Sequence, residues 1–212
     1  MAITNYGELR AAVLALTDRG SDVEPYIPDF VTLAEDTIFN GSETVKDPLR
    51  VRQMMAVQDL TPVDGVCTLP DDYLQYRRVV EKASIRRPLQ FVTPDYADQE
   101  YPTRSGGLAC DFTIVGDGLY MFPVSSNDIE LTYYQRAPAL DSGDDASVNW
   151  LLTKHPFLYL HAVAFQLAIF VKDTTLAAQE SGVVSQTIST LNTSSQNSEF
   201  ANAAYRPRGF FP

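Results

Sequence analysis

The spacing of apolar residues predicts an amphipathic helix near the start of the chain. In "NYGELRAAVLALTD", Leu9, Val13 and Leu16 recur at three- and four-residue steps, which places them on one helical face. Asn5 is suited to cap this helix, and Glu8 follows three residues later, as in a capping box.

A second amphipathic helix is predicted for "IPDFVTLAEDTIFN". Pro28 suits its first turn, where the missing N–H has no helical partner. The stripe expected to be buried consists of Phe30, Leu33, Ala34 and Ile38. The chain therefore opens with two helices.

From residue 48 the period changes, and β-rich runs replace the helical pattern. These runs are "QYRRVVEKA", "RRPLQFV", "CDFTIV", "LYMFPV" and "DIELTYYQR". Two of them are separated by "GDG" at 116–118, which predicts a hairpin. Thr93 and Pro94 predict the cap and first turn of a short helix, "TPDYADQEY".

The longest apolar run, from Phe157 to Val171, predicts a central core helix. It contains His161 and Gln166 and is shorter than the about 20 apolar residues of a membrane-spanning helix. Because it is apolar nearly all round, other elements are expected to surround it. A further helix is predicted where apolar residues again recur at helical steps, namely Leu176, Val183, Val184, Ile188 and Leu191. The residues from Asn197 onward show no period and are expected to be extended.

Helices before and after a β-rich region predict an α+β fold. We expect an antiparallel helical bundle built from residues 1–47 and 138–199, with a central β-rich insertion domain at 48–137. Residues 200–212, called the C-terminal segment below, are expected to be extended.

The net charge and the cysteine content limit the classes of function that this chain could have. The net charge of −11 disfavours general affinity for nucleic acid, whose phosphates require Lys and Arg. A surface of acidic residues would repel DNA, which suits a channel for DNA better than a DNA-binding protein.

Cys67 and Cys110 are too few for a zinc site or a disulfide framework, and both are expected to be reduced and buried. The start, "MAITNYGELR", lacks the pattern of a secretory signal.

The chain carries no recognisable catalytic motif. His155 and His161 are six residues apart, about 240° around a helix, so they cannot form a metal-binding pair on one face. They are expected to be a helix-start His and a core His with a satisfied hydrogen bond. Asp141, Asp144 and Asp145 miss the calcium-loop spacing and are expected in a solvated loop. We therefore nominate no catalytic, cofactor-binding or metal-ligating residue, and expect no enzyme and no cofactor.

Six arginines give the β-rich region local positive charge. They could form one surface for an acidic neighbour, or they could protect solvated edge strands, and the sequence favours neither. These arginines are Arg50, Arg52, Arg77, Arg78, Arg86 and Arg87.

The C-terminal segment is predicted to bind a partner. Its candidate residues belong to the types that dominate binding hot spots, and they are Tyr205, Arg206, Arg208, Phe210 and Phe211. Burying three aromatic rings contributes roughly 5–9 kcal/mol. Ordering about a dozen residues costs on the order of 10 kcal/mol or more. The segment is therefore expected to become ordered only on a partner, as in an assembly component.

The order of several stretches resembles the head-to-tail adaptor (connector) proteins of short-tailed bacteriophages, a family related to tail tubular protein A. The most specific stretches are "LPDDYLQYRRV" and "NWLLTKHPFLYLHAVAFQLAIF". The others are "MAITNYGELRAAV", "IPDFVTLAEDTI", "LRVRQMM", "RRPLQFVTPDY", "FTIVGDGLYMFP" and "IELTYYQRAPAL".

This resemblance implies a structural protein of the virion neck that assembles in the host cytoplasm. It implies a ring of twelve copies beneath the portal protein, which extends the DNA channel and supports the tail nozzle or tube and tail fibre proteins. DNA would pass without specific binding, and no membrane is involved. Two alternatives remain: a tail tube or nozzle subunit, and a glycan-binding or glycan-degrading tail protein, the latter suggested by the Tyr- and Asp-rich strands.

Overall fold

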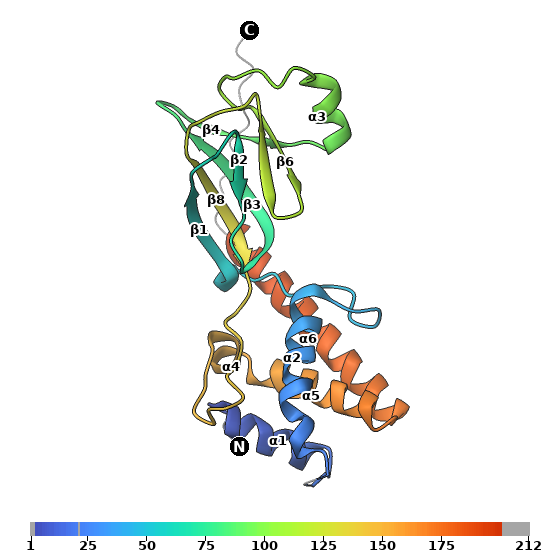
Figure 1. Ribbon diagram of the computed structural model, residues 1–212. Helices are drawn as coiled ribbons and strands as arrows, with labels where there is room; N and C mark the ends of the chain where they lie inside the picture. Colours follow the sequence, from blue (N-terminus) through green and yellow to red (C-terminus); the bar gives the residue numbers. More distant parts are fainter. Residues whose placement is uncertain (1–2, 21, 201–212) are drawn as a thin grey trace. The chain divides into compact units, whose positions relative to one another are not determined.

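A computed structural model describes residues 3–20 and 22–200. It confirms the mixed α+β class, with helices at both ends of the chain and strands between them (Figure 1). The contacts divide the chain into two compact units. The helical unit contains the residues up to Arg52 and those from Ala137 onward, and the β unit is Gln53–Arg136.

In the helical unit, α5 (Pro156–Phe170) packs against four other helices. Figure 1 shows α2 crossing α5, and α6 running beside it. The other helices are α1 (Tyr6–Leu16), the short 3-10 helix η1 (Glu24–Tyr26), α2 (Ile27–Asn40), α4 (Trp150–Lys154) and α6 (Thr174–Phe200).

The predicted cap of α1 is confirmed, with one variation. The Asn5 side chain accepts a hydrogen bond of 2.9 Å from the Glu8 N–H. The Glu8 carboxylate accepts from both the backbone N–H and the hydroxyl of Thr4, at 2.6 and 2.7 Å, and thus reaches one residue further back than a capping box requires. Leu9 and Val13 are buried as predicted, but Leu16 is 43% exposed, because it lies in the last turn of the helix.

The bounds of α2 agree with the predicted stretch, but one residue of its predicted stripe is wrong. Phe30, Ala34 and Ile38 are buried, whereas Leu33 is 52% exposed. The buried positions also include Ile27 and Val31, which moves the centre of the buried face away from Leu33. Leu33 consequently shares the outer face of α2 with polar residues.

The apolar run does form a helix surrounded by others, and its middle is buried as predicted. Its ends are different: Phe157, Ile169 and Phe170 are 55%, 51% and 49% exposed. Residues 197–200 were expected to be extended and are helical, because α6 continues to Phe200.

Side chains of α6 bind the backbone that follows α2. The Asn192 side chain accepts from the Arg50 N–H at 2.7 Å and donates to the Pro48 carbonyl at 3.0 Å. The Ser195 hydroxyl accepts from the Arg52 N–H at 2.8 Å. Polar residues that favour no helix by themselves are thus held in one by tertiary contacts.

The β unit contains two four-stranded sheets. The first has the order β1 (Met55–Leu60), β8 (Ile129–Gln135), β3 (Tyr73–Lys82), β4 (Arg86–Pro88). The second has the order β2 (Val66–Thr68), β7 (Gly118–Phe122), β6 (Asp111–Val115), β5 (Gln90–Phe91). All pairs are antiparallel except β5–β6. Both sheets contribute to one apolar core, for example with Phe112, Met121 and Leu131.

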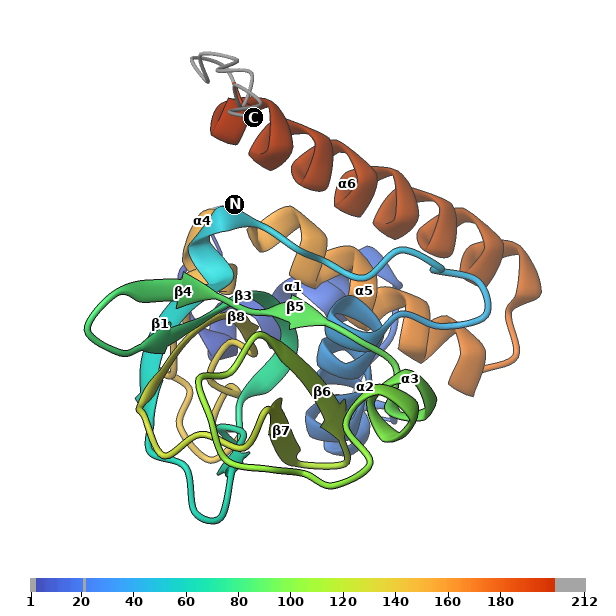
Figure 2. The ribbon, with the colours of Figure 1, turned by 90° about the horizontal axis from the view of Figure 1, so that it is seen from above.

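The predicted hairpin and short helix of the β unit are confirmed. Val115 pairs with Gly118, so Gly116 and Asp117 form the turn between β6 and β7, seen in Figure 2. Thr93 caps α3 (Pro94–Glu100), its side chain accepting from the Tyr96 N–H. A 3-10 turn, η2 (Arg52–Met54), precedes β1.

The prediction for the cysteines is half right. Cys67 is buried, whereas Cys110 is exposed, because the neighbouring Ala109 takes the inward position. The Cys110 sulfur instead accepts a weak hydrogen bond of 3.5 Å from Arg87 Nη1.

Candidate functional site

The residues predicted to bind a partner, Tyr205, Arg206, Arg208, Phe210 and Phe211, lie outside the described residues. The described chain ends with α6 at Phe200, the first residue of the C-terminal segment. The described residues expose other surfaces that a partner protein could contact. Buried or half-buried polar networks hold the helices and strands that carry these surfaces in place.

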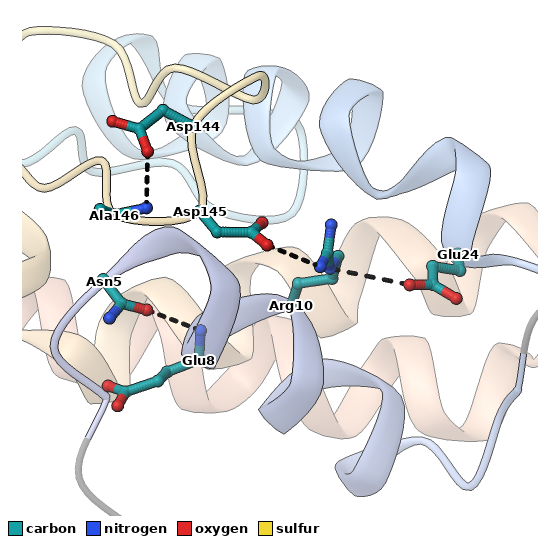
Figure 3. A network of polar contacts seen from close by, with 7 residues as sticks. All are labelled: Asn5, Glu8, Arg10, Glu24, Asp144, Asp145 and Ala146. Atoms are coloured by element: carbon teal, nitrogen blue, oxygen red, sulfur yellow. Dashed lines mark hydrogen bonds and ion pairs between the residues drawn. The ribbon is translucent and has the colours of Figure 1, made fainter.

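One network joins α1 to the acidic loop before α4 (Figure 3). Arg10 lies between Asp145, at 3.2 Å, and Glu24, at 3.7 Å. The backbone reinforces this contact, since the Gly7 N–H donates to the Asp145 carbonyl at 3.0 Å. A Cβ added at Gly7 would lie 3.1 Å from the Asp145 Cβ, so a larger residue would disturb the approach of the loop. Because the ion pairs are exposed, each contributes at most about 1 kcal/mol.

The aspartates of that loop accept hydrogen bonds from backbone N–H groups of the same loop. The Asp144 carboxylate accepts from the Ala146 N–H, and the Asp141 carboxylate from the Gly143 N–H, both at 2.9 Å. Among residues 3–20 and 22–200, no cluster of His, Cys, Asp and Glu is arranged to hold a metal ion.

A buried network fixes the segment that leads from the β unit into α4. Glu35 of α2, 3% exposed, accepts hydrogen bonds from the Tyr159 hydroxyl of α5 and from the Leu140 N–H. Asn149 caps α4 through the Leu152 N–H, and its amide donates to the Tyr159 hydroxyl and to the Pro138 carbonyl. A buried carboxylate is tolerated because its hydrogen-bond partners compensate for lost water.

The two histidines occupy separate positions, as predicted. His155 stands at the N-terminus of α5, where burial, together with Lys154, lowers the pKa of its imidazole. His161 pairs through Nδ1 with Glu180 of α6, and both side chains are largely buried. This pair joins α5 to α6.

In the β unit, Glu81 is buried where two loops meet. Its Oε1 accepts from the Ser125 hydroxyl at 2.6 Å, the Asn127 amide at 3.0 Å and the Ala109 N–H at 3.2 Å. Burial acts to raise the pKa of the Glu81 carboxyl, but these hydrogen bonds, aided by Arg87, outweigh it and lower the pKa. Glu81 therefore holds the loops around Ala109 and Ser125 as a carboxylate.

The aromatic residues near α3 also serve the interior of the β unit. The Tyr101 ring stacks on Phe122 at 5.5 Å, and its hydroxyl donates to Asp111 at 2.7 Å, which raises the pKa of Tyr101 to about 12. Arg104 covers the same Phe122 ring and pairs with Asp98 at 2.7 Å. These contacts fix α3 and the following loop against β6 and β7.

The six arginines do not all belong to the strands. Arg50 and Arg52 lie in the helical unit, and the guanidinium of Arg50 donates to the Phe39 and Leu49 carbonyls. Arg86 and Arg87 lie exposed on β4, an edge strand, where Arg86 pairs with Glu130. The edge-strand interpretation therefore holds for β4, since charged side chains protect such edges.

One candidate surface of the helical unit is apolar, and we call it the α2/α5 surface. It consists of Tyr26, Leu33, Ile169 and Phe170, which are 45% to 52% exposed. The Phe170 ring contacts the rings of Tyr26 and Phe30, at 5.0 and 5.2 Å. About two turns after Phe30 on α2, Thr37 accepts a hydrogen bond of 2.9 Å from Gln166 of α5. Leu33 stands between Phe30 and Thr37 along α2 and is exposed.

The α2/α5 surface continues into a groove of about 450 Å³. Ile169 and Gln166 form one wall, Ala177, Ala178 and Ser181 of α6 another, and residues 42–44 the end. Small residues on α6 leave this groove open.

A second apolar surface, here the Phe157 surface, lies at the junction of α4 and α5. Phe157 is 55% exposed and its ring lies 4.2 Å from that of His161. Lys154 is exposed three residues earlier. Val148, 58% exposed, lies directly before the α4 cap. Sequence reasoning missed both surfaces, because it assigned the apolar positions of α2 and α5 wholly to the core.

The thiol of Cys67 is not suited to act as a nucleophile. Burial raises the pKa of Cys67 to about 11, which disfavours its thiolate. Both histidines belong to the helical unit and both cysteines to the β unit. Within the described chain, no helix is long and apolar enough to cross a bilayer.

Half-exposed apolar surfaces of this kind are typical of proteins that act by contact with other proteins. The chain belongs to the SU10 adaptor protein family, which it matches over residues 4–207. This is a structural bacteriophage family of the head–tail junction and not an enzyme family. No protein in the curated collection matches this chain.

Proposed function

We propose that this chain forms a ring beneath the portal protein of the capsid, extends the DNA channel and supports the tail. The observation that carries the proposal is the match to the adaptor family over nearly the whole chain. The net charge of −11 supports it further, because an acidic channel wall lets DNA pass without holding it.

The two units and the C-terminal segment take different roles in this proposal. The helices form an antiparallel bundle that contacts neighbouring copies, twelve in the ring. The β unit faces the tail nozzle or tube, and the tail fibre proteins attach at that level. The C-terminal segment extends to the portal, with Tyr205, Arg206, Arg208, Phe210 and Phe211 as its docking residues. Assembly takes place in the host cytoplasm, and the ring remains in the virion neck.

The C-terminal segment provides the test. A chain ending at Phe200 retains every described helix and strand, so it should fold, yet it should fail to attach to portal-bearing heads. A matched control replaces residues 201–212 by a Gly/Ser linker of equal length, and it should fail equally. Undiminished attachment of either variant would reject the docking role.

A further inference from the structure

We propose that a pocket between α3 and the second sheet of the β unit binds the phenol ring of a tyrosine from another protein. The pocket has a volume of about 350 Å³, and all the residues that line it belong to the β unit. The inference goes beyond the proposed function, because it stands whether or not the chain forms a ring.

The alternation of side chains along β6 and β7 builds one side of the pocket. Phe112 of β6 and Met121 of β7 belong to the core that the two sheets share, so Thr113 and Tyr120 point to the opposite face of the second sheet. Thr113 and Tyr120 are also paired in the register of the two strands. α3 lies beside β6 (Figure 1) and contributes Ala97 to the lining of the pocket.

The pocket has a buried base and an exposed rim. Ala97, Thr113 and Phe122 form the base and are at most 3% exposed, whereas Val115 at the rim is 51% exposed. A cavity of about 150 Å³ already admits a benzene ring, so this pocket has room for one substituted ring. A ring that enters from the rim meets the base with its far end.

The base contains a polar group that lacks a partner. The hydroxyl of Thr113 is buried, and among the described residues no atom forms a hydrogen bond with it. Such a group costs free energy, because it has lost its hydrogen bonds to water without replacing them. The base therefore favours a ligand whose inner end carries a hydrogen-bonding group.

The rim favours a ligand that is neutral and aromatic. Arg104 and Asp98 both line the pocket, but they pair with each other at 2.7 Å, so neither requires a charged ligand. Tyr120 supplies an aromatic wall, and rings pack favourably against other rings. A Cβ added at Gly118 would lie 2.9 Å from the Tyr120 ring, so the glycine lets this ring lie close to the sheet.

The side chain of a tyrosine meets all of these requirements. Its hydroxyl lies opposite the atom that joins the ring to the backbone, so the hydroxyl can reach Thr113 while the backbone stays at the rim. The side chain of a phenylalanine has no polar group, and the N–H of a tryptophan projects from the side of its ring. The incoming backbone would cover Val115, and tyrosine is among the residues that dominate binding hot spots.

The test compares two probes that differ by one hydroxyl: p-cresol, the side chain of tyrosine, and toluene, that of phenylalanine. With the full chain, p-cresol should shift the methyl NMR signals of Ala97 and Val115 but not that of Ala164 in the helical unit. N-acetyltyrosinamide should shift the same two signals, because its backbone groups remain at the rim. Thr113→Val removes the hydroxyl, so the Kd of p-cresol should rise at least about 5-fold relative to that of toluene.

Thr132→Val is the matched control. Thr132 lies on β8 of the first sheet, whereas the pocket lies on the second, so this variant should leave both Kd values unchanged. Without a ligand, Thr113→Val should raise the midpoint of thermal unfolding, because it removes a buried hydroxyl that has no partner. The same measurement verifies that the variant folds.

Four results would overturn the inference. Two concern the probes: p-cresol leaves the Ala97 and Val115 signals unshifted, or Thr113→Val changes the affinities for p-cresol and toluene equally. A lower unfolding midpoint of Thr113→Val would mean that the hydroxyl is already satisfied within the protein. Binding of p-cresol without binding of N-acetyltyrosinamide would mean that the pocket takes a free aromatic compound and not the side chain of a protein.

Discussion

Each unit contains a buried carboxylate whose hydrogen bonds hold loops in place. Glu35 binds the segment before α4 to α2 and α5, and Glu81 binds two loops of the β unit. A buried acceptor that loses a donor bears the full desolvation penalty, so such residues are the sensitive points of the fold. Both are structural residues, and neither has contacts typical of acid–base catalysis.

Tyr159→Phe should destabilise the helical unit by about 1–3 kcal/mol. The change removes the hydroxyl that donates to Glu35 and accepts from Asn149, while the ring remains packed. Urea unfolding measures the loss of stability. The fluorescence of Trp150, the single tryptophan of the sequence, reports on unfolding of the helical unit. Tyr26→Phe, at a half-exposed position of the same unit, should change the free energy of unfolding by less than about 0.5 kcal/mol. Equal losses would contradict the role of the network.

Glu81 should make the β unit sensitive to acid. Its folded-state pKa is lowered from the ordinary 4.5, so its stabilising effect is present above 4.5 and is lost as the pH falls through the folded-state pKa. In Glu81→Gln this loss is absent, although the variant is less stable at neutral pH because a charged acceptor is missing. Hydrogen exchange of the Val79 and Leu131 amides between about pH 6 and pH 3 follows the difference between the two proteins.

Asp59→Asn is the control for the acid experiment. Asp59 pairs with Lys82 at 2.7 Å on the exposed side of the sheet, so its replacement should leave the acid sensitivity of the β unit nearly unchanged. If Glu81→Gln retained the acid sensitivity of the unmodified chain, another carboxylate would have to be responsible.

Residue-level predictions from the sequence succeeded where local geometry decides and failed where burial depends on neighbours. Asn5, Pro28 and Thr93 were placed correctly, because caps and first turns depend on a few adjacent backbone groups. Leu33 and Cys110 were wrongly assigned to the core. Their periodicity and type suit burial, but whether another element covers them is a property of the whole fold.

The elements were largely predictable from their period. The bounds of α2 and the β6–β7 hairpin follow from apolar spacing and turn residues. β2, with three residues, was missed because it is too short to show alternation. The last turns of α6 were missed because Ser and Asn carry no apolar period there, while Asn192 and Ser195 are held by the backbone of residues 48–52.

Two glycines of the β unit should respond differently to alanine. Gly65 and Gly116 both have positive φ, 78° and 58°, so each Gly→Ala change costs about 1–2 kcal/mol in backbone strain. At Gly65 an added Cβ would also lie 2.6 Å from the Val124 side chain, whereas nothing lies within 4 Å at Gly116. Thermal unfolding of the two variants should show a clearly larger loss for Gly65→Ala. A larger loss for Gly116→Ala would contradict the described packing of the loop before β2.

At the scale of the whole molecule, the chain combines an acidic overall charge with apolar surfaces on the helical unit. The sequence indicated the α+β class, the lack of a catalytic motif and the adaptor family. It did not indicate the α2/α5 and Phe157 surfaces, since a periodic pattern does not distinguish a residue buried within one chain from one covered by another. Its predicted docking residues in the C-terminal segment stay a prediction.

The arrangement of copies in the intact virion tests the central proposal most directly. Cryo-electron microscopy of the neck should locate this chain as a ring between portal and tail, with DNA on its axis. Density that places the chain further down the tail, or a virion neck without it, would contradict the account.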